Sequence, residues 1–365
     1  MKRLAWILRG LAMAGGLAGL SAQAADFYQG KTLTVFVNFT PGGPTDVEAR
    51  LLARHIGKHL AGNPTVIVKN MGGAGGVIGV NWLGQIAAPD GLTVGFFTGA
   101  ASKTAMGDPG IQIDLRKFGF VAGGPGISVT YMRSDVAPGI KTAADLMKAG
   151  NFWVGGLATE SDKDVRMRMG LDLLGIKYRY VSGYPGSAEA RLAFQRKEIE
   201  FFNESMPTYR ASIEPALVKT GEAVPVWFDF INDGDSYTRL PDADGIDALH
   251  FRDFYIKMKG EAPKGELWDA YRVINAVGTT FLRILVVPPG SPKDSIAALK
   301  QGLQGLQNDA DYRDEANKTI KFVPRYVTDE KAEQLFQLAA NPEPKMRAFI
   351  RDYIELGKKM NGKRD

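Results

Sequence analysis

The feature that most constrains the fold is a repeated alternation of a short β-branched segment, a glycine-rich turn and an amphipathic segment. Residues 32–37 form the first β-branched segment, and the turn Pro-Gly-Gly-Pro at residues 41–44 follows it. Apolar residues then recur at helical spacing as far as Leu60. Because parallel strands need a long crossover between them, strands that alternate with helices predict a mostly parallel sheet flanked by helices.

The same alternation continues and then restarts near the middle of the chain. Further strands are expected at 65–68 and 92–97, with a helix at about 77–88 between them. The second series comprises, in order, a strand at 152–155, a helix at 163–174, a strand at 178–181, a helix at 188–196 and a strand at 199–202. We therefore predict two α/β lobes of similar construction.

The remaining segments connect or complete these lobes. Strands at 119–122 and 129–132 are expected to lead the chain from the first lobe to the second. From about 228 to 276 the alternation weakens. After it, an apolar strand is expected at 281–287, followed by helices at 293–308, 330–340 and 343–360.

The N-terminal residues have the pattern of a secretory signal peptide. Lys2, Arg3 and Arg9 precede an uncharged stretch at 10–22, and Ala-Gln-Ala at 22–24 offers small residues for cleavage. The stretch is shorter than the roughly 20 residues that a membrane-spanning helix needs. We expect residues 1–24 to be removed on export to the periplasm; the alternatives are an uncleaved anchor or a buried helix.

Composition excludes several classes of function. The chain is 45% hydrophobic and 23% charged, as in globular proteins, and it has no cysteine for thiol chemistry or cysteine-based metal sites. Without the three basic residues of the expected signal peptide, 42 basic residues face 40 acidic ones. No cluster of Lys and Arg interleaved with aromatic residues is present, which argues against nucleic-acid binding. No later stretch reaches 18 consecutive apolar residues, so the mature chain is not expected to be membrane-embedded.

Two glycine-rich turns of the first half are candidate anion sites. One spans residues 41–46, and the other is Gly-Gly-Ala-Gly-Gly at 72–76. Each lies between an expected strand and an expected helix, where unpaired backbone N–H groups favour an anion and glycine permits its close approach. An ordinary strand-to-helix turn with an N-cap explains the first equally well, and the second is interpreted as an anion-binding loop that faces the first.

The second turn is not a dinucleotide fingerprint. Gly73 and Gly75 fit the first two glycines of that motif, but Ile78 stands at the position of the third. No Gly-Lys-Ser/Thr follows, so a phosphate-binding P-loop is also excluded. We expect no cofactor.

Two loops of the second half raise the same question of ligand contact against local capping. At 157–162 the sequence is Leu-Ala-Thr-Glu-Ser-Asp, in which Thr159 and Ser161 offer hydroxyl groups to a carboxylate. Capping of the next helix by Ser161 or Asp162 is the alternative. The loop at 184–187, Tyr-Pro-Gly-Ser, is similarly placed.

No pattern of catalytic or metal-binding residues stands out. His55 and His59 have i, i+4 spacing, but without the Glu of a zinc-protease motif they are interpreted as ordinary helix residues. The only other histidine is His250, and no Gly-x-Ser-x-Gly nucleophile elbow is present. Accordingly, we predict no enzymatic activity, no catalytic residue and no metal site.

The motifs in combination resemble one family. Pro-Gly-Gly-x-x-Asp at 41–46, Asn70 with its glycine loop, and Pro-Asp-Gly at 89–91 are joined by Gly-Tyr-Pro-Gly-Ser at 183–187 and Val-Pro-Pro-Gly-Ser-Pro at 287–292. This series is similar to that of the Bug receptors, the extracytoplasmic solute receptors of tripartite tricarboxylate transporters. The resemblance extends over nearly the whole mature chain.

The resemblance implies a periplasmic-binding-protein fold, type II-like, whose two lobes close on a ligand. It places residues 25–125 and 278–365 in the first lobe and 126–277 in the second, with an extended segment at about 231–276. The residues that it implies as ligand contacts are Phe39, Thr40, Gly42, Gly43, Thr45, Asp46, Gly73, Ala74, Gly75, Thr98 and Ala100 from the first lobe, and Ala158, Thr159, Ser161, Tyr184 and Asn203 from the second.

The chain departs from the family pattern in two places. The second-lobe loop is unusually acidic, so a dicarboxylate would face Glu160 unless Lys163 or Arg166 compensates. The segment from about 231 to 276 is also longer than the family usually has.

The function expected from these features is capture of a small organic carboxylate and its delivery to integral-membrane transporter subunits. A receptor of this shape is expected to be a monomer. The alternatives are a ligand-sensing partner of a signalling membrane protein and, last, an exported hydrolase.

Overall fold

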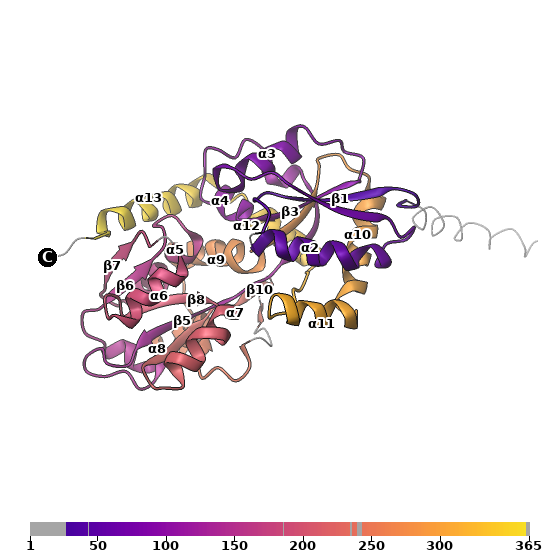
Figure 1. Ribbon diagram of the computed structural model, residues 1–365. Coiled ribbons are helices and arrows are strands. Elements are labelled where there is room, and N and C mark those ends of the chain that lie inside the picture. Colours follow the sequence, from indigo (N-terminus) through magenta and orange to yellow (C-terminus); the bar gives the residue numbers. More distant parts are fainter. Residues whose placement is uncertain (1–26, 43, 185, 234–235, 239–242, 363–365) are drawn as a thin grey trace, which may run out of the picture.

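The computed structural model describes residues 27–42, 44–184, 186–233, 236–238 and 243–362, and the expected signal peptide lies outside this range. The chain forms two α/β units, each built on one sheet (Figure 1). The first sheet has the order β2 (Thr65–Asn70), β1 (Thr32–Val37), β3 (Thr93–Thr98), β13 (Arg283–Val287) and β4 (Gly119–Gly124). The second has the order β12 (Leu249–His250), β9 (Ala223–Phe228), β5 (Ser128–Arg133), β8 (Phe201–Ser205), β6 (Trp153–Gly156) and β7 (Arg179–Ser182).

Helices cover both sheets, as expected for an α/β fold. With the first sheet lie α2 (Pro44–Ile56), η1 (Gly57–His59), η2 (Ala74–Gly76), α3 (Val77–Gln85), α4 (Ala100–Ala105), η3 (Leu115–Lys117), α10 (Lys293–Gln307), α11 (Ala310–Thr319) and α12 (Glu330–Ala339). With the second lie η4 (Ala143–Lys148), α5 (Asp162–Leu174), α6 (Ser187–Gln195), α7 (Met206–Thr208), η5 (Tyr209–Val218), α8 (Phe251–Lys259) and α9 (Glu266–Asn275). A short hairpin, β10 (Ile231–Asp233) and β11 (Ser236–Thr238), completes the described strands.

Apolar side chains fill both faces of each sheet, because successive residues of a strand point to opposite sides. On β1, Val35 belongs to the cluster that includes α2, whereas Phe36 belongs to the cluster on the α3 side. On β8, Phe201 and Phe202 divide in the same way between the two clusters of the second sheet. Apolar residues on both faces of a strand, as at Val35 and Phe36 of β1, are the signal from which the sequence predicted these interior strands.

Each sheet is mostly parallel and contains one antiparallel strand that follows a crossing between the lobes. The chain leaves β4 and enters the second sheet as β5, which is antiparallel to β8 and β9. It returns as β13, which is antiparallel to β3 and β4. The expectation that strands near 119–122 and 129–132 carry the chain across is confirmed by these positions.

The two crossing segments are held against each other. The Gly126 amide donates a hydrogen bond to the Thr279 carbonyl oxygen at 2.8 Å. A Cβ atom at Gly126 would lie 2.4 Å from Leu282 Cδ2, so a larger residue there would displace the Leu282 side chain. The hinge region is thus a pair of linked segments, one between β4 and β5 and the other at the end of the helical stretch that precedes β13.

The segment before the second crossing joins the two cores. Helix α9 packs on α5 and continues into the π-helix η7 (Ala276–Thr280), which packs on α4 and α12. Val273 contacts apolar clusters of both lobes. Figure 1 shows α9 near the middle of the molecule. The extended segment expected from the sequence therefore contributes, through α9, to the contact between the lobes.

The chain ends on the second lobe. Helix α13 (Pro344–Met360) packs on α9 and β7, and Ile350 and Ile354 join the core of the second sheet. The lobe boundaries inferred from the sequence remain a prediction, and α13 was included there with the first lobe. Among the described residues, no helix has both the length and the apolar character needed to cross a membrane.

A buried ion pair lies beside the crossings. Arg166 of α5 donates from Nε and Nη2 to the two carboxylate oxygens of Asp229 at 3.0 and 2.9 Å. Asp229 also accepts a hydrogen bond from the Ser128 amide at 3.0 Å, at the start of β5. Their side chains are 5% and 1% exposed, so neither charge is hydrated and each depends on the other.

Asp229→Ala is expected to destabilise the protein by about 3–5 kcal/mol, because it leaves the buried Arg166 charge without its main partner. Urea unfolding followed by far-UV circular dichroism measures this loss. Glu261→Gln is the control, since it removes an ion pair with Lys264 in which the side chains are 59% and 78% exposed. Similar unfolding midpoints for both variants would contradict the role of the buried pair.

Candidate functional site

Three loops meet at the carboxyl edge of the first sheet. They follow β1, β2 and β3, and we refer to residues 38–42, 71–76 and 98–100 as the first-lobe loop cluster. Neighbouring parallel strands β2, β1 and β3 end at the same edge, so residues far apart in sequence become neighbours there. Phe39, Thr40, Gly42, Gly73, Ala74, Gly75, Thr98 and Ala100 are the predicted contacts in the cluster, while Gly43 lies outside the described residues.

Buried Asn38 connects two of these loops. Its side-chain oxygen accepts from the Thr98 amide at 3.1 Å, and its Nδ2 donates to the Thr98 carbonyl at 3.1 Å and the Gly76 carbonyl at 3.4 Å. The hydroxyl groups of Thr45 and Thr98 lie 2.8 Å apart. Sequence analysis missed Asn38, although a polar side chain directly after an apolar strand was a visible signal.

Asp46 organises the first loop from the start of α2. Its carboxylate accepts hydrogen bonds from the Gly42 amide at 2.8 Å, Asn70 Nδ2 at 2.9 Å and Arg50 Nε at 2.9 Å. Burial alone would raise the pKa of this carboxyl group, but the hydrogen bonds outweigh it and hold the pKa below its usual range. Asp46 is only 2% exposed, so it acts on a ligand by shaping the loop.

The glycine-rich loop presents its backbone to solvent. Gly73, Gly75 and Gly76 have φ values of 122°, 62° and 93°, in the region that favours glycine. Gly73, Ala74 and Gly75 are exposed. A Cβ atom at Gly75 would lie 3.3 Å from Lys103 Nζ, so the ammonium group of Lys103, which pairs with Asp108 at 2.9 Å, lies beside this loop. The arrangement suits an anion.

The predicted second-lobe loop is built around Asp164. Its Oδ2 atom accepts hydrogen bonds from the Ala158 amide at 3.0 Å and from the Tyr180 hydroxyl at 2.9 Å. The Ser161 hydroxyl caps α5 by accepting from the Asp164 amide at 3.2 Å. The local capping alternative therefore describes Ser161, and Ala158 is held by a buried carboxylate.

The other second-lobe candidates are also engaged within the protein. The Thr159 hydroxyl donates to Glu160 Oε2 at 2.9 Å, and the Thr159 carbonyl accepts from Arg168 at 2.7 Å. Asn203 lies buried within β8, where its Nδ2 donates to the Thr130 hydroxyl at 2.9 Å, while its Oδ1 has no hydrogen-bond partner among the described residues. Tyr184 is half-buried against the core that includes β5 and β8.

The chain's own η7 lies between the two sets of candidates. The Ser102 hydroxyl of α4 donates to the Val277 carbonyl at 3.3 Å, and a Cβ atom at Gly278 would lie 2.2 Å from Asp162 Oδ2 at the start of α5. Because Arg166 is committed to Asp229 and Asp162, it does not offer the charge compensation for Glu160 considered from the sequence.

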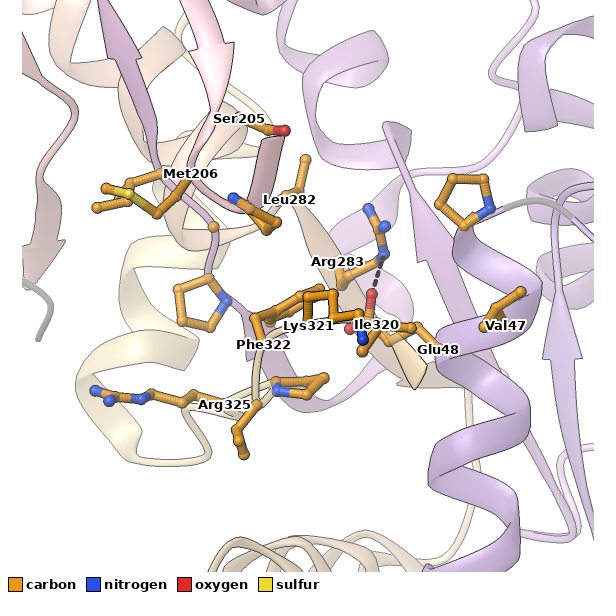
Figure 2. Close-up of a pocket in the computed structure, with 18 of the residues that line it drawn as sticks. Val47, Glu48, Ser205, Met206, Leu282, Arg283, Ile320, Lys321, Phe322 and Arg325 are labelled. Atoms are coloured by element: carbon orange, nitrogen blue, oxygen red, sulfur yellow. Dashed lines mark hydrogen bonds and ion pairs between the residues drawn. The ribbon is translucent and has the colours of Figure 1, made fainter. Parts of the chain in front are cut away.

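A cavity of 1160 Å³ opens between the lobes on the side of α2 and α11, and we refer to it as the hinge cavity. Its lining combines the crossing segments with the start of α2, residues 205–208 and the stretch 320–325. Figure 2 shows Arg283 of the crossing segment paired with Glu48, close to Leu282. Of the predicted ligand contacts that the structure describes, only Gly42 lines this cavity.

The histidine pair connects two helices. His55 Nε2 lies 2.6 Å from Glu315 Oε2, and His59 Nε2 lies 2.8 Å from Asp309 Oδ2, both carboxylates being at α11 or its N-cap. Within the described residues, no group of three or more His, Asp and Glu side chains is arranged to hold a metal ion. The pair therefore tethers α11, whose Arg313 lines the hinge cavity.

Comparison with curated sequences identifies partial relatives. A UPF0065 protein of Agrobacterium vitis, from the TAR-I ttuE-ttuC' intergenic region, is 34% identical over 179 residues, 46% of this chain and 49% of the relative. Protein BugT of Bordetella pertussis is 43% identical over 91 residues, 25% of this chain and 27% of BugT. The chain thus spans about half or less of the length of these relatives. No family model matches the sequence.

Comparison with solved structures covers almost the whole chain. A TctC solute binding protein from Polaromonas aligns over 90% of this chain and 99% of its own, with 20% identity and a TM-score of 0.65. The periplasmic binding protein BugD aligns over 91% and 98%, with 20% identity and a TM-score of 0.52. The predicted two-lobed binding-protein fold and the resemblance to the Bug receptors are both confirmed.

Asp164 gives this site a pH-dependent stability. Burial raises the pKa of its carboxyl group from 3.8 to about 6, although the Tyr180 hydroxyl, Lys163 and the Ala158 amide oppose the shift. The folded protein therefore binds more protons than the unfolded chain between these values, so stability falls as pH rises from about 4 to about 6, by up to about 3 kcal/mol.

Asp164→Asn is expected to flatten this decline, because the amide does not titrate and its oxygen still accepts the two hydrogen bonds. Urea unfolding between pH 4 and 7 measures the effect. Asp352→Asn, at a side chain 79% exposed, serves as the control and should keep the wild-type slope. An unchanged slope in the Asp164 variant would contradict the assignment.

Proposed function

We propose that this relative of the Bug receptors is a periplasmic solute-binding receptor that captures a small organic carboxylate as its lobes close. It would then deliver the ligand to integral-membrane subunits of a tripartite tricarboxylate-type transporter. The exported location follows from the expected signal peptide, and no catalytic step is part of the proposal.

The observation that carries the proposal is the pre-organised first-lobe loop cluster. Exposed backbone groups of Gly73 to Gly75 lie beside Lys103, and the loop before α2 is fixed by the partners of Asp46. A site whose donors are already in place binds an anion without first ordering a loop, which favours affinity. The two lobes are joined through crossing segments and packed helices, an arrangement that permits closure on a ligand.

The ligands of similar structures agree with this class. A Rhodopseudomonas palustris protein solved with adipate aligns over 90% of this chain at 15% identity, with a TM-score of 0.54. MatC from the same organism, solved with bound malate, aligns over 88% at 18% identity, with a TM-score of 0.51. Malate and adipate are both dicarboxylates, and we extend to this chain only the shared carboxylate.

The settings of the histidines favour binding over hydrolysis. His55 and His59 contact the carboxylates of Glu315 and Asp309, and His250 Nε2 lies 2.9 Å from Asp253. A nucleophile activated by histidine needs its hydroxyl within hydrogen-bond reach of the ring. These contacts instead serve helix packing and capping.

Thermal unfolding of the purified protein against malate, adipate, benzoate and glutamate tests the proposal. A ligand that binds only the folded state should stabilise it by about 2.7 kcal/mol at one hundred times its dissociation constant, which raises the melting temperature. A matching series of uncharged amides is the control. Absence of any shift with millimolar acids would overturn the carboxylate assignment.

Asp46→Ala is expected to weaken binding of the acid found in that screen by about tenfold, because the Gly42, Asn70 and Arg50 donors lose their common acceptor. Isothermal titration calorimetry measures the change. Asp90→Ala is the matched control, since Asp90 also accepts a backbone hydrogen bond, from Leu92 at 2.9 Å, but in the turn before β3. Wild-type affinity in the Asp46 variant would remove that loop from the site.

A further inference from the structure

The hinge cavity is large and, among the described residues of the first-lobe loop cluster, only Gly42 lines it. At 1160 Å³ it exceeds the range of about 300–1,000 Å³ typical of small-molecule pockets. It lies on the α2 and α11 side of the crossing segments, and α2 contributes to it through Pro44, Val47 and Glu48.

One part of the lining is apolar and comes from both lobes. Ile127 and Leu282 lie on the two crossings, Met206 lies on the second lobe, and Phe322 and Val323 extend from the first. Leu282 is 37% exposed although it lies beside Gly126 of the other crossing segment. Single exposed leucines are common, but here several apolar side chains line one concave surface.

The charged part of the lining is strongly positive. Among the described lining residues are Arg283, Arg313, Lys321 and Arg325, with Glu48 as the acidic residue. A fifth cation, Arg210, is bound to the Glu214 carboxylate at 2.9 Å. Within the described part of the chain, Arg313 and Arg325 have no carboxylate partner within 4.0 Å. An anionic ligand would supply the missing countercharge.

Arg283 is the best-placed anchor among these cations. Its Nε donates to Glu48 Oε2 at 3.1 Å, which fixes the guanidinium group while its side chain is only 12% exposed. In Figure 2 the terminal nitrogens of Arg283 point away from the strand. Arginine held in this way presents two parallel N–H donors that match a carboxylate.

We propose that the hinge cavity binds the apolar body of an organic acid whose carboxylate pairs with Arg283 and the neighbouring arginines. This rests on the proposed receptor function and narrows the ligand class to amphipathic acids, such as aryl- or alkyl-substituted carboxylates. Since the ligand would contact Leu282 on a crossing and Met206 on the second lobe, its binding would favour closure.

Calorimetry with three probes tests the inference. 3-Phenylpropionate carries both the charge and the apolar body, malate lacks the apolar body, and 3-phenylpropanol lacks the charge. We expect 3-phenylpropionate to bind at least about tenfold more tightly than either of the others. Malate lacks the apolar contact with the cavity, and 3-phenylpropanol lacks the ionic contact with the arginines. Tighter binding of malate than of 3-phenylpropionate would overturn the inference.

Two variants locate the site without disturbing the core. Leu282→Ser should weaken 3-phenylpropionate binding about tenfold and leave malate binding unchanged, whereas Leu192→Ser, at a leucine 49% exposed on α6, should change neither. Arg325→Gln should weaken 3-phenylpropionate but not 3-phenylpropanol. Its control is Arg351→Gln on α13, at a side chain 68% exposed.

The outcomes separate the two proposals. If acids bind but neither Leu282→Ser nor Arg325→Gln differs from its control, the hinge cavity is not the site and the receptor function stands. If malate, adipate and 3-phenylpropionate all fail to bind the wild-type protein, the receptor function and the inference both fall.

Discussion

The pairing of the two crossing segments is the constraint on which the rest of the structure depends. The Gly126 amide donates to the Thr279 carbonyl at 2.8 Å. This hydrogen bond holds the segment between β4 and β5 against the segment that leads into β13. Each sheet contains one strand that the chain enters after crossing from the other lobe, and that strand runs antiparallel to its neighbours. Leu282 and Arg283 follow soon after Thr279 and line the cavity between the lobes. The hinge segments therefore also form part of the cavity wall.

Two buried charged side chains near the crossing segments are each paired with a side chain of opposite charge. Arg166 and Asp229 neutralise each other below the crossings, and Arg283 and Glu48 do so beside the cavity. Burial raises the pKa of Glu48 in spite of Arg283, which reflects how little water reaches that pair. Arg313 and Arg325 remain without a carboxylate partner among the described residues, and they lie where both lobes meet.

The alternation of strands and helices was predictable because interior strands are apolar on both faces and glycine marks the turns. That signal located β1 and α2 within a few residues. It did not reveal the role of α9 and η7, whose burial depends on contacts with α4, α5 and α12. The first-lobe loop cluster could be inferred from strand ends, whereas the hinge cavity draws residues from segments more than 200 positions apart, such as Glu48 and Arg283. No local pattern records such a distance.

Helix α2 links the two candidate binding regions. Its first turn carries Asp46, which fixes the loop at Gly42, and two residues later Glu48 holds Arg283 in the hinge cavity. The far end of the same helix is tied to α11 through His55 and Glu315, and α11 carries Arg313. A ligand that moved α2 would therefore shift residues of the first-lobe loop cluster and of the hinge cavity together. Rigid helices transmit such shifts because packed side chains have few alternative arrangements. On this reasoning α2 couples the hinge cavity, where we place the acid, to the first-lobe loop cluster, so an acid bound in the cavity acts on both regions through one helix.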